Sequence, residues 1–553
     1  MAEQVIPARH QPALPLDRLI LAEQPDEESV PMDVVFVGGG PAGLAGAIEL
    51  ARLVKRDNEA GGGLGDIEIG VLEKADGLGE HCLSGAVVNP APFRELFPEL
   101  EETDFPFRTR VERDAVYWLP NGSHAVRIPT PPTMRNHGFY VASICEVVRW
   151  LGEKAEELGV NIFTGFPAAA LLVDGQRVIG VRTTPSGLDR NGEPTSAYTP
   201  PTDIVARVTA LAEGTRGMLS QAYLQWQGIT SENPQIYALG VKELWETRVP
   251  LDTVVHTLGW PLPTDAFGGT FLYPLEPNVL ALGLVVGLDY HQTGLDPHGL
   301  LQQLKLHPLF RRYLDGGEMV EWGAKTIPEG GYYALPSRRY GDGVVILGDS
   351  AGFVDVPSLK GIHYAVQSGI FAARAIFAAL KAGDVSAARL AAYDRMVEDS
   401  FIMRDLYQRR NMRLAFRSGL FMGGAKAALM TLTGGRFPGS RIATPSDAAV
   451  PRQPGGVTHF VPDGKLTFRK VDAVYKSGNA TRDTIPSHLI VGEDVPPEVA
   501  ELYEHLCPAG VYERQDGRLI VNAPNCIDCK ATDVLGPRWT PREGGSGPRY
   551  RRM

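Results

Sequence analysis

The first regular pattern along the chain is a strand, a glycine-rich turn and a helix. Residues 33–37 (Asp-Val-Val-Phe-Val) form a short apolar run typical of a buried strand, and the helix-like residues 44–56 follow the turn Gly38-Gly39-Gly40-Pro41-Ala42-Gly43. A second strand-like run, residues 67–74, contains Glu73 near its end. This order of elements predicts a Rossmann-type nucleotide-binding unit.

The turn carries the spacing G-x-G-x-x-G in its required setting between a strand and a helix. Gly38 permits the tight turn, Gly40 lets the backbone approach a pyrophosphate, and Gly43 allows close packing of the helix on the strand. The start of the helix, at Ala42, supplies oriented N–H groups to the anion. Glu73 is expected to accept hydrogen bonds from an adenosine ribose, although a glycine-rich insertion places it 30 residues past Gly43. The alternative is a glycine-rich turn without a ligand.

Two later segments favour FAD over NAD. Residues 344–356 predict a strand, then Gly348-Asp349 and a helix start, and Glu213-Gly214 follows another strand-like run. These segments resemble the secondary FAD motifs of flavoproteins built like p-hydroxybenzoate hydroxylase. The resemblance implies that Asp349 holds the ribityl chain and that the following helix points its positive end at the flavin, whose reduced form carries negative charge. The alternative is that Asp349 is only a helix N-cap.

Composition limits the class of protein. The 553 residues suggest about three or four structural units, and 44% apolar with 22% charged residues is a globular composition. The net charge of −11 disfavours a general nucleic-acid-binding role. The N-terminal residues lack a secretory signal pattern, and no stretch reaches 18 uninterrupted apolar residues. We therefore expect any contact with a membrane to be at its surface.

The cysteines are few and uneven. The five are Cys82, Cys145, Cys507, Cys526 and Cys529, too sparse for a disulfide framework. Three of them fall within the last 47 residues, a clustering that indicates metal chemistry. We interpret Cys82 and Cys145 as small packed side chains.

The cysteine tail resembles a known family. The segments that begin at Cys507 (Cys-Pro-Ala-Gly-Val-Tyr-Glu), at Asn525 (Asn-Cys-Ile-Asp-Cys-Lys) and at Glu543 resemble the iron–sulfur tail of the electron transfer flavoprotein-ubiquinone oxidoreductase family. Matching segments extend over about residues 32–550; they are 83–86, 136–138, 240–245, 259–262, 268–273, 287–290 and 360–363. The resemblance implies FAD and a 4Fe-4S cluster as cofactors, with electron transfer flavoprotein and a membrane quinone as partners.

One cluster ligand of the family pattern is missing. The family tail supplies four cysteines, but Thr532 stands where the fourth is expected. Three thiolates hold a 3Fe-4S cluster, or a 4Fe-4S cluster whose fourth iron takes water or an oxygen ligand such as Thr532, Asp528 or Asp533. In a further alternative the cluster is lost, and the tail is a relic fold without metal.

The resemblance also assigns further site residues. It adds a set of cofactor-binding residues, which are Ser84, Gly85, Glu213, Gly214, Gly348, Asp349, Lys360, Gly361 and His363. Lys360 and His363 are the polar candidates for tuning the flavin. Phe267, Gly268 and Gly269 match the quinone headgroup site, where backbone groups can bond a quinone oxygen. No catalytic triad is expected.

The implied fold combines α/β and α+β parts. It has a Rossmann-type FAD domain of the p-hydroxybenzoate hydroxylase type, an inserted β-rich quinone domain and a C-terminal ferredoxin-like domain. The expected boundaries are a lead at 1–31, the FAD domain at 32–105, 139–231 and 335–425, the quinone domain at 106–138 and 232–334, and the iron–sulfur domain at 450–553.

A basic segment beside an apolar one predicts attachment to a membrane surface. Residues 401–417 hold Arg404, Arg409, Arg410, Arg413 and Arg417 with one aspartate, a local charge of +4, and the moderately apolar residues 419–435 follow. Basic residues beside an apolar stretch too short to span suit monotopic attachment to anionic lipid, which we assign to residues 401–440 on the cytoplasmic face of a bacterial-type inner membrane. The alternative is a solvated helix face.

The resemblance, together with these patterns, implies an FAD enzyme that takes electrons singly from reduced electron transfer flavoprotein and delivers two to ubiquinone or menaquinone. One alternative is a flavin reductase or hydroxylase of the geranylgeranyl-reductase type with a structural tail. Another is a non-catalytic docking protein that retains FAD for stability.

Overall fold

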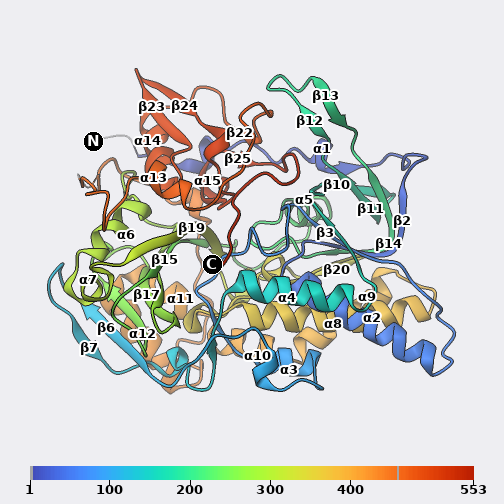
Figure 1. The fold of residues 1–553 in the computed structure, drawn as a ribbon, viewed down its shortest axis with the longest axis horizontal. Coiled ribbons are helices and arrows are strands. Elements are labelled where there is room, and N and C mark those ends of the chain that lie inside the picture. The colour runs from blue at the N-terminus through green and yellow to red at the C-terminus, as the bar shows by residue number, and fades with distance from the viewer. Residues whose placement is uncertain (1–3, 458–459) are drawn as a thin grey trace.

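The computed structural model describes residues 4–457 and 460–553 (Figure 1). Its largest sheet has nine strands, and the predicted strand–turn–helix–strand unit lies within it. The strands are β1 (Ile20–Leu21), β10 (Ala168–Asp174), β11 (Arg177–Thr183), β14 (Asp203–Leu211), β2 (Val30–Val37), β3 (Ile69–Glu73), β9 (Asn161–Thr164), β20 (Tyr340–Gly341) and β21 (Val344–Ile346). The strands β21, β14, β2, β3 and β9 pair in parallel, as in a Rossmann-type sheet.

Four long helices cover this sheet along its lower face in Figure 1. They are α2 (Pro41–Glu59), α4 (Ile144–Glu156), α8 (Ile362–Lys381) and α9 (Ala387–Glu398). The helices α2 and α8 approach closely because both have glycine at the contact. A Cβ on Gly369 would lie 2.3 Å from the carbonyl oxygen of Ala42, and a Cβ on Gly46 would lie 2.5 Å from the ring of Phe36. The predicted helix is therefore fixed against the sheet and against the second half of the domain.

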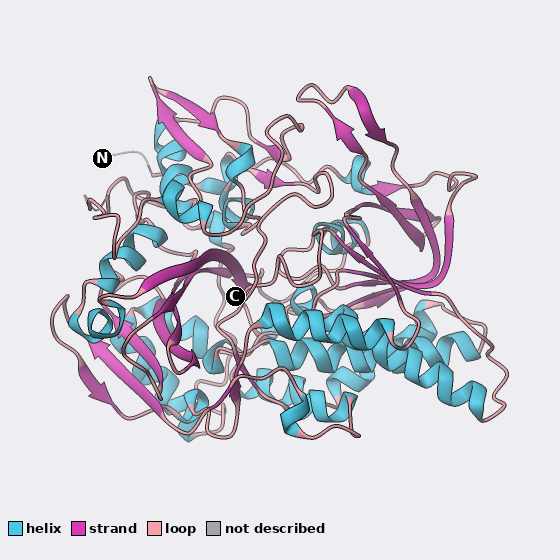
Figure 2. Ribbon diagram, in the orientation of Figure 1, coloured by secondary structure: helices cyan, strands magenta, loops and turns pink. Residues whose placement is uncertain are grey.

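A second sheet of seven strands stands beside the first, on the left in Figure 2. Its strands are β19 (Glu318–Pro328), β15 (Tyr237–Glu246), β18 (Val279–Gly287), β17 (Gly268–Glu276), β16 (Val254–Gly259), β6 (Asp114–Leu119) and β7 (Val126–Ile128). The pairing is antiparallel except for β16 with β6, so two separate chain segments build one sheet. The expected β-rich insert is thereby confirmed.

Smaller elements complete the fold. The helices are α1 (Leu16–Leu19), α3 (Ala91–Leu96), α5 (Met218–Trp226), α6 (Pro297–Lys305), α7 (Pro308–Leu314), α10 (Phe401–Gln408), α11 (Met412–Ala415), α12 (Leu420–Leu432), α13 (Lys470–Tyr475), α14 (Pro497–Leu506) and α15 (Ala531–Leu535). The short strands pair as β4 (Val87–Val88) and β5 (Thr109–Arg110) with β8 (Tyr140–Val141), β12 (Ser186–Leu188) with β13 (Pro194–Thr199), β22 (Leu489–Ile490) with β25 (Arg538–Trp539), and β23 (Tyr512–Gln515) with β24 (Arg518–Val521).

The C-terminal elements pack on both larger units and on the N-terminal lead. The amide of Gln11 donates to the carbonyl oxygen of Asp533 at 2.8 Å, and Arg538 donates to that of Pro12 at 2.8 Å. Within residues 4–457 and 460–553, no helix is both long and apolar enough to cross a bilayer.

One expected element is wrong in detail. The helix expected directly after Asp349 is only a four-residue 3-10 turn, η5 (Gly348–Ala351), and Gly352 ends it with a positive φ of 87°. The long helix α8 begins at Ile362, and its N-cap Gly361 is next to the cavity described below. A later helix therefore provides the positive end that the sequence placed after Asp349.

Candidate cofactor sites

A cavity of about 340 Å³ opens where the carboxyl ends of β2, β3 and β14 meet the second sheet. Most of the predicted cofactor residues line it, although they come from distant parts of the chain. They are Gly38, Gly40, Ala42, Glu73, Ser84, Gly85, Glu213, Gly214, Asp349, Lys360 and Gly361. The position follows the general rule that ligands of open α/β sheets bind outside the carboxyl ends of the strands.

The glycine turn at one end of the cavity has the geometry that a pyrophosphate requires. A Cβ on Gly38 or Gly43 would meet a carbonyl oxygen at 2.3 Å or 2.1 Å, so both glycines serve close packing. A Cβ on Gly40 would meet no atom within 4 Å, so that position is open towards the cavity. Glu73 accepts hydrogen bonds from the backbone N–H groups of Gly39 (3.1 Å) and Ala75 (2.9 Å), which fix its carboxylate at the cavity wall.

The two acidic residues of the later motifs have different roles. Glu213 accepts hydrogen bonds from the N–H groups of Leu219 and Ser220, and so caps helix α5. Asp349 makes no capping hydrogen bond, and its nearest polar partner is the hydroxyl of Thr215 at 3.5 Å. Burial raises the pKa of Asp349 to about 6. The N-cap alternative is therefore wrong for Asp349, and its carboxylate is free to accept hydrogen bonds from a ligand.

Three of the predicted cofactor residues do not line the cavity. Gly43 lies within the turn packing, and the N–H of Gly348 donates to Ser368 at 3.0 Å. His363 is buried, with its ring centroid 6.1 Å from that of Phe401 in a stacked arrangement. Burial lowers the pKa of His363 to about 3, so its ring is neutral. Unlike Lys360, His363 packs inside the protein without reaching the cavity.

Several lysines line the cavity. The Nζ atom of Lys360 donates to Asn136 at 2.5 Å, and that of Lys242 donates to the carbonyl oxygen of Ser84 at 2.8 Å. Burial lowers the pKa of each of these two lysines to about 8. Lys325 and Lys530 also line the cavity. Cations here would stabilise the negative charge of a reduced flavin.

Sequence reasoning missed Lys242, Lys325 and Lys530. The first two lie inside β15 and β19, strands whose apolar residues are mostly buried and which also hold the buried glutamates Glu243 and Glu321. Charged residues within such apolar strands are the signal that could have identified the lysines, because a buried charge is rarely tolerated without a function or a partner.

A second, much smaller pocket lies in the C-terminal part of the chain. Cys507, Cys526 and Cys529 line it together with Thr532. The hydroxyl of Tyr512, another lining residue, lies 3.3 Å from that of Thr532. Burial, followed by the proximity of the other two thiols, raises the pKa of Cys529 well above its usual value. A cationic iron centre would offset this cost by binding the thiolates, so the three cysteines fit an iron–sulfur cluster.

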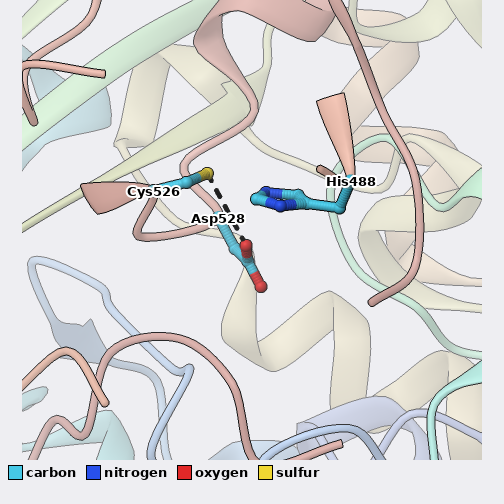
Figure 3. Close-up of side chains that lie close together, drawn as sticks. All are labelled: His488, Cys526 and Asp528. Atoms are coloured by element: carbon cyan, nitrogen blue, oxygen red, sulfur yellow. Dashed lines mark hydrogen bonds between the residues drawn. The ribbon is translucent and has the colours of Figure 1, made fainter. Parts of the chain in front are cut away.

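A neighbouring group of potential ligands is already paired within the protein. Figure 3 shows His488, Cys526 and Asp528 close together, with 3.8 Å between the sulfur of Cys526 and an oxygen of Asp528. However, Lys74 donates to one oxygen of Asp528 at 2.6 Å, and Arg542 donates to the other at 2.9 Å. Asp528 is thus neutralised without a metal.

The carboxylate of Asp533, like that of Asp528, is already paired within the protein. Its carboxylate pairs with Arg216 and accepts the N–H of Trp539 at 3.0 Å. Of the three proposed oxygen ligands, Thr532 alone lines the small pocket.

Comparison with known proteins decides the family. Two family models match the chain, "ETF-QO, ubiquinone-binding" over residues 237–327 and "Electron transfer flavoprotein-ubiquinone oxidoreductase, 4Fe-4S" over residues 464–551. The mitochondrial electron transfer flavoprotein-ubiquinone oxidoreductase of Oryza sativa is 37% identical over 95% of this chain and 93% of its own length. The Pseudomonas aeruginosa protein of the same name is 36% identical over 96% of this chain and 100% of its own length.

The chain belongs to the electron transfer flavoprotein-ubiquinone oxidoreductase family. FAD and an iron–sulfur cluster are the cofactors of this family, and the two sites above fit them. A solved structure supports the fold. A geranylgeranyl bacteriochlorophyll reductase-like protein from Thermoplasma acidophilum superposes on this chain with a TM-score of 0.56 and 18% sequence identity. The superposition covers 74% of this chain and 97% of the Thermoplasma protein. The predicted fold class is confirmed.

The residues that match the family's quinone site lie outside the flavin cavity, near α12. The ring of Phe267 packs against Phe416 (5.2 Å between centroids) and beneath the guanidinium of Arg413 (4.0 Å). The N–H of Leu420, the first residue of α12, donates to the carbonyl oxygen of Thr264 at 3.3 Å. Gly268 and Gly269 begin β17, where a Cβ would meet backbone oxygens at 2.1 Å and 2.7 Å.

The prediction of a basic membrane-facing surface is wrong for three of the five arginines. Arg413 is buried in ion pairs with Glu329 and Asp289, at 2.6 Å and 2.8 Å. Arg409 pairs with Asp355, and Arg410 donates to backbone carbonyls. These side chains satisfy buried carboxylates and carbonyls of the protein and leave only Arg404 and Arg417 exposed.

Residues 420–437 expose large apolar side chains to solvent. Five large apolar side chains on and just after α12 are exposed, namely Phe421 (70%), Met422 (57%), Leu429 (40%), Leu432 (85%) and Phe437 (59%). An exposed apolar group of this size marks an interaction surface.

Proposed function

We propose that this chain passes electrons from reduced electron transfer flavoprotein to ubiquinone at a membrane surface. The observation that carries the proposal is that a cavity lined by the FAD motifs and a pocket lined by three cysteines share a wall, in a chain that matches 93% of the length of a family member. When bound, FAD exchanges one or two electrons and the cluster one, so the pair converts single-electron delivery into two-electron quinone reduction.

The residues of the cavity would bind and orient the flavin nucleotide. The N-terminus of α2 at Gly40 would receive the pyrophosphate, and Glu73 would accept hydrogen bonds from the ribose. Asp349 would hold the ribityl hydroxyls. The N-terminus of α8, with Lys360 and Lys242, would stabilise negative charge on the reduced ring.

For the cluster, we propose that Cys507, Cys526 and Cys529 bind three irons and that Thr532 faces the fourth. The hydroxyls of Thr532 and Tyr512 provide a polar corner suited to a water or hydroxyl ligand. Because oxygen ligands hold iron of such clusters less firmly than thiolate, we expect this iron to be lost readily, which converts a 4Fe-4S cluster to 3Fe-4S.

For the membrane, we propose peripheral attachment through α12. Its exposed side chains would enter the apolar layer, and Lys426 and Arg417 would remain at the headgroups. The predicted quinone residues next to α12 would then be close to the bilayer, where a hydrophobic quinone is dissolved. The division into a lead, a discontinuous FAD domain, a quinone domain and an iron–sulfur domain, with the boundaries given above, is part of this proposal.

The test is anaerobic ubiquinone reduction by the FAD-loaded chain. Reduced electron transfer flavoprotein should support reduction of ubiquinone, and NADH or NADPH should not replace it as donor. A donor preference for NADPH with an isoprenoid substrate would instead support the reductase alternative. FAD binding without quinone reduction from any of these donors would support the docking alternative, and either result would refute the proposal.

A further inference from the structure

Two residues line both the flavin cavity and the cluster pocket within the described part of the chain. They are Lys530 and Trp539. Lys530 directly follows the ligand Cys529, whereas Trp539 comes from the short strand β25, which pairs with β22. Trp539 is 5% exposed, so its indole fills the wall between the two sites.

The cysteine loop contacts both sites. Cys526 and Cys529 line the cluster pocket, while Asp528 reaches Lys74, which lines the flavin cavity. Asp528 and Lys530 have positive φ values of 55° and 62°, a conformation that is uncommon for residues with a side chain. Such strain persists only where the surroundings determine the conformation, and it is common at functional sites.

The indole of Trp539 is held by contacts with three residues. Its Nε1–H donates to Asp528 at 2.9 Å. The ammonium groups of Lys74 and Lys530 lie 4.7 Å and 4.3 Å from the centre of the ring. These cation–π contacts and the hydrogen bond to a buried carboxylate fix both the position and the orientation of the ring.

We propose that Trp539 is the bridge through which an electron passes between the cluster and the flavin. One electron leaves the reduced cluster and enters the flavin, no covalent bond forms or breaks, and the indole has the same oxidation state before and after. A continuous aromatic contact carries this electron better than a gap, because electronic coupling falls steeply across space that no atom fills. The nearby cation of Lys74 favours negative charge close to the ring. The inference rests on the proposed presence of a cluster.

The experiment compares Trp539→Leu and Trp539→Phe in the complete, FAD-loaded and cluster-loaded protein. A short light pulse with a photoreductant delivers a substoichiometric number of electrons, and flavin absorbance together with freeze-quench EPR of the cluster follows their equilibration. We expect Trp539→Leu to slow equilibration by about tenfold or more, which corresponds to roughly 1.4 kcal/mol of barrier. Trp539→Phe, which keeps an aromatic ring, should recover much of the rate.

Several measurements keep the test specific. Iron, sulfide and FAD contents and both midpoint potentials are measured for each variant, and rates are compared at equal driving force. Trp322→Leu is the matched control, because Trp322 is fully buried in β19 and lines neither site, and it should equilibrate at the wild-type rate. If Trp539→Leu fails to bind the cluster, Trp539→Met takes its place, since methionine adapts to irregular gaps.

The outcomes separate this inference from the proposed function. Wild-type protein without iron, or without ubiquinone reduction, would refute the proposed function and the bridge with it. Active wild-type protein together with a Trp539→Leu variant that equilibrates at the wild-type rate would refute the bridge alone. Loss of the cluster in all three Trp539 variants would make Trp539 a structural residue and would also overturn the bridge.

Discussion

Asp528 provides a quantitative test of how the cysteine loop is attached to the flavin-binding part of the chain. Its carboxylate is 1% exposed and faces Lys74 at 2.6 Å and Arg542 at 2.9 Å. Arg542 is itself only 4% exposed. Asp528→Asn keeps the shape and an acceptor for Trp539 but leaves these cations without a counter-charge. Breaking a buried pair in this way costs about 3–5 kcal/mol, and we expect that loss in the free energy of unfolding.

The pH dependence follows from the same contacts. Burial alone would raise the pKa of Asp528, but Arg542 and then Lys74 hold it well below its ordinary value of 3.8. Because the unfolded state takes up its proton first, the ion pairs stabilise the fold fully above about pH 4 and lose this contribution as the pH falls further. The difference between wild type and Asp528→Asn should therefore shrink below about pH 4.

The assay is denaturant unfolding of the apoprotein at several pH values, combined with iron analysis of the reconstituted protein. Asp394→Asn is the control, since Asp394 pairs with buried Arg339 at 2.8 Å and lines neither cofactor site. It should destabilise the chain and leave the cluster spectrum unchanged. If Asp528→Asn left stability unchanged but lost iron, Asp528 would be a metal ligand and our assignment of it as an ion-pair partner would be refuted.

Three further predictions concern the flavin, the cluster and the membrane. Gly40→Ala should fold normally yet bind FAD weakly, because the added Cβ meets no protein atom and points into the cavity. Gly43→Ala should instead destabilise the fold, because its Cβ would lie 2.1 Å from a backbone oxygen. FAD titration and thermal unfolding distinguish these two effects. Thr532→Cys should give four irons per chain and suppress the EPR signal of a 3Fe-4S cluster. Phe421→Ser with Leu432→Ser should weaken liposome binding by at least about 3 kcal/mol, more than 100-fold, without affecting flavin reduction.

Each of these has a clear contrary result. Full FAD affinity in Gly40→Ala would place the pyrophosphate elsewhere. An iron content of only three per chain in Thr532→Cys would show that Thr532 does not face the fourth iron. Tyr475→Ser is the membrane control, because Tyr475 is 85% exposed on α13 rather than α12; equal liposome binding by all three proteins would argue against α12 as the attachment surface.

Local patterns made the flavin-binding end predictable. The turn from Gly38 to Gly43 depends on neighbours in sequence, so its glycine spacing specifies the geometry found between β2 and α2. A metal site in the C-terminal part was equally predictable from its three cysteines, since thiolate ligands favour soft metals. Only the fold shows that Asp528 and Asp533 are already paired and that, of the three oxygen candidates, Thr532 lines the pocket.

Features that depend on long-range packing were not predictable. A run of arginines indicates a solvated basic face, but Arg413 satisfies the buried carboxylates of Glu329 and Asp289, which lie 84 and 124 residues away in sequence. Likewise, the contact of Trp539 with Lys74 joins residues from opposite ends of the chain. No local pattern carries that information.

If electrons from electron transfer flavoprotein reach ubiquinone through this chain and its three-cysteine cluster, the donor must reduce both cofactors and the quinone must reoxidise them. The most direct measurement is anaerobic EPR and flavin absorbance of the membrane-bound protein, first with one equivalent of reduced electron transfer flavoprotein and then with ubiquinone. We expect the donor to change both the cluster and flavin signals and ubiquinone to reverse both changes. Signals that do not respond to the donor, or that ubiquinone does not reverse, would refute this electron route.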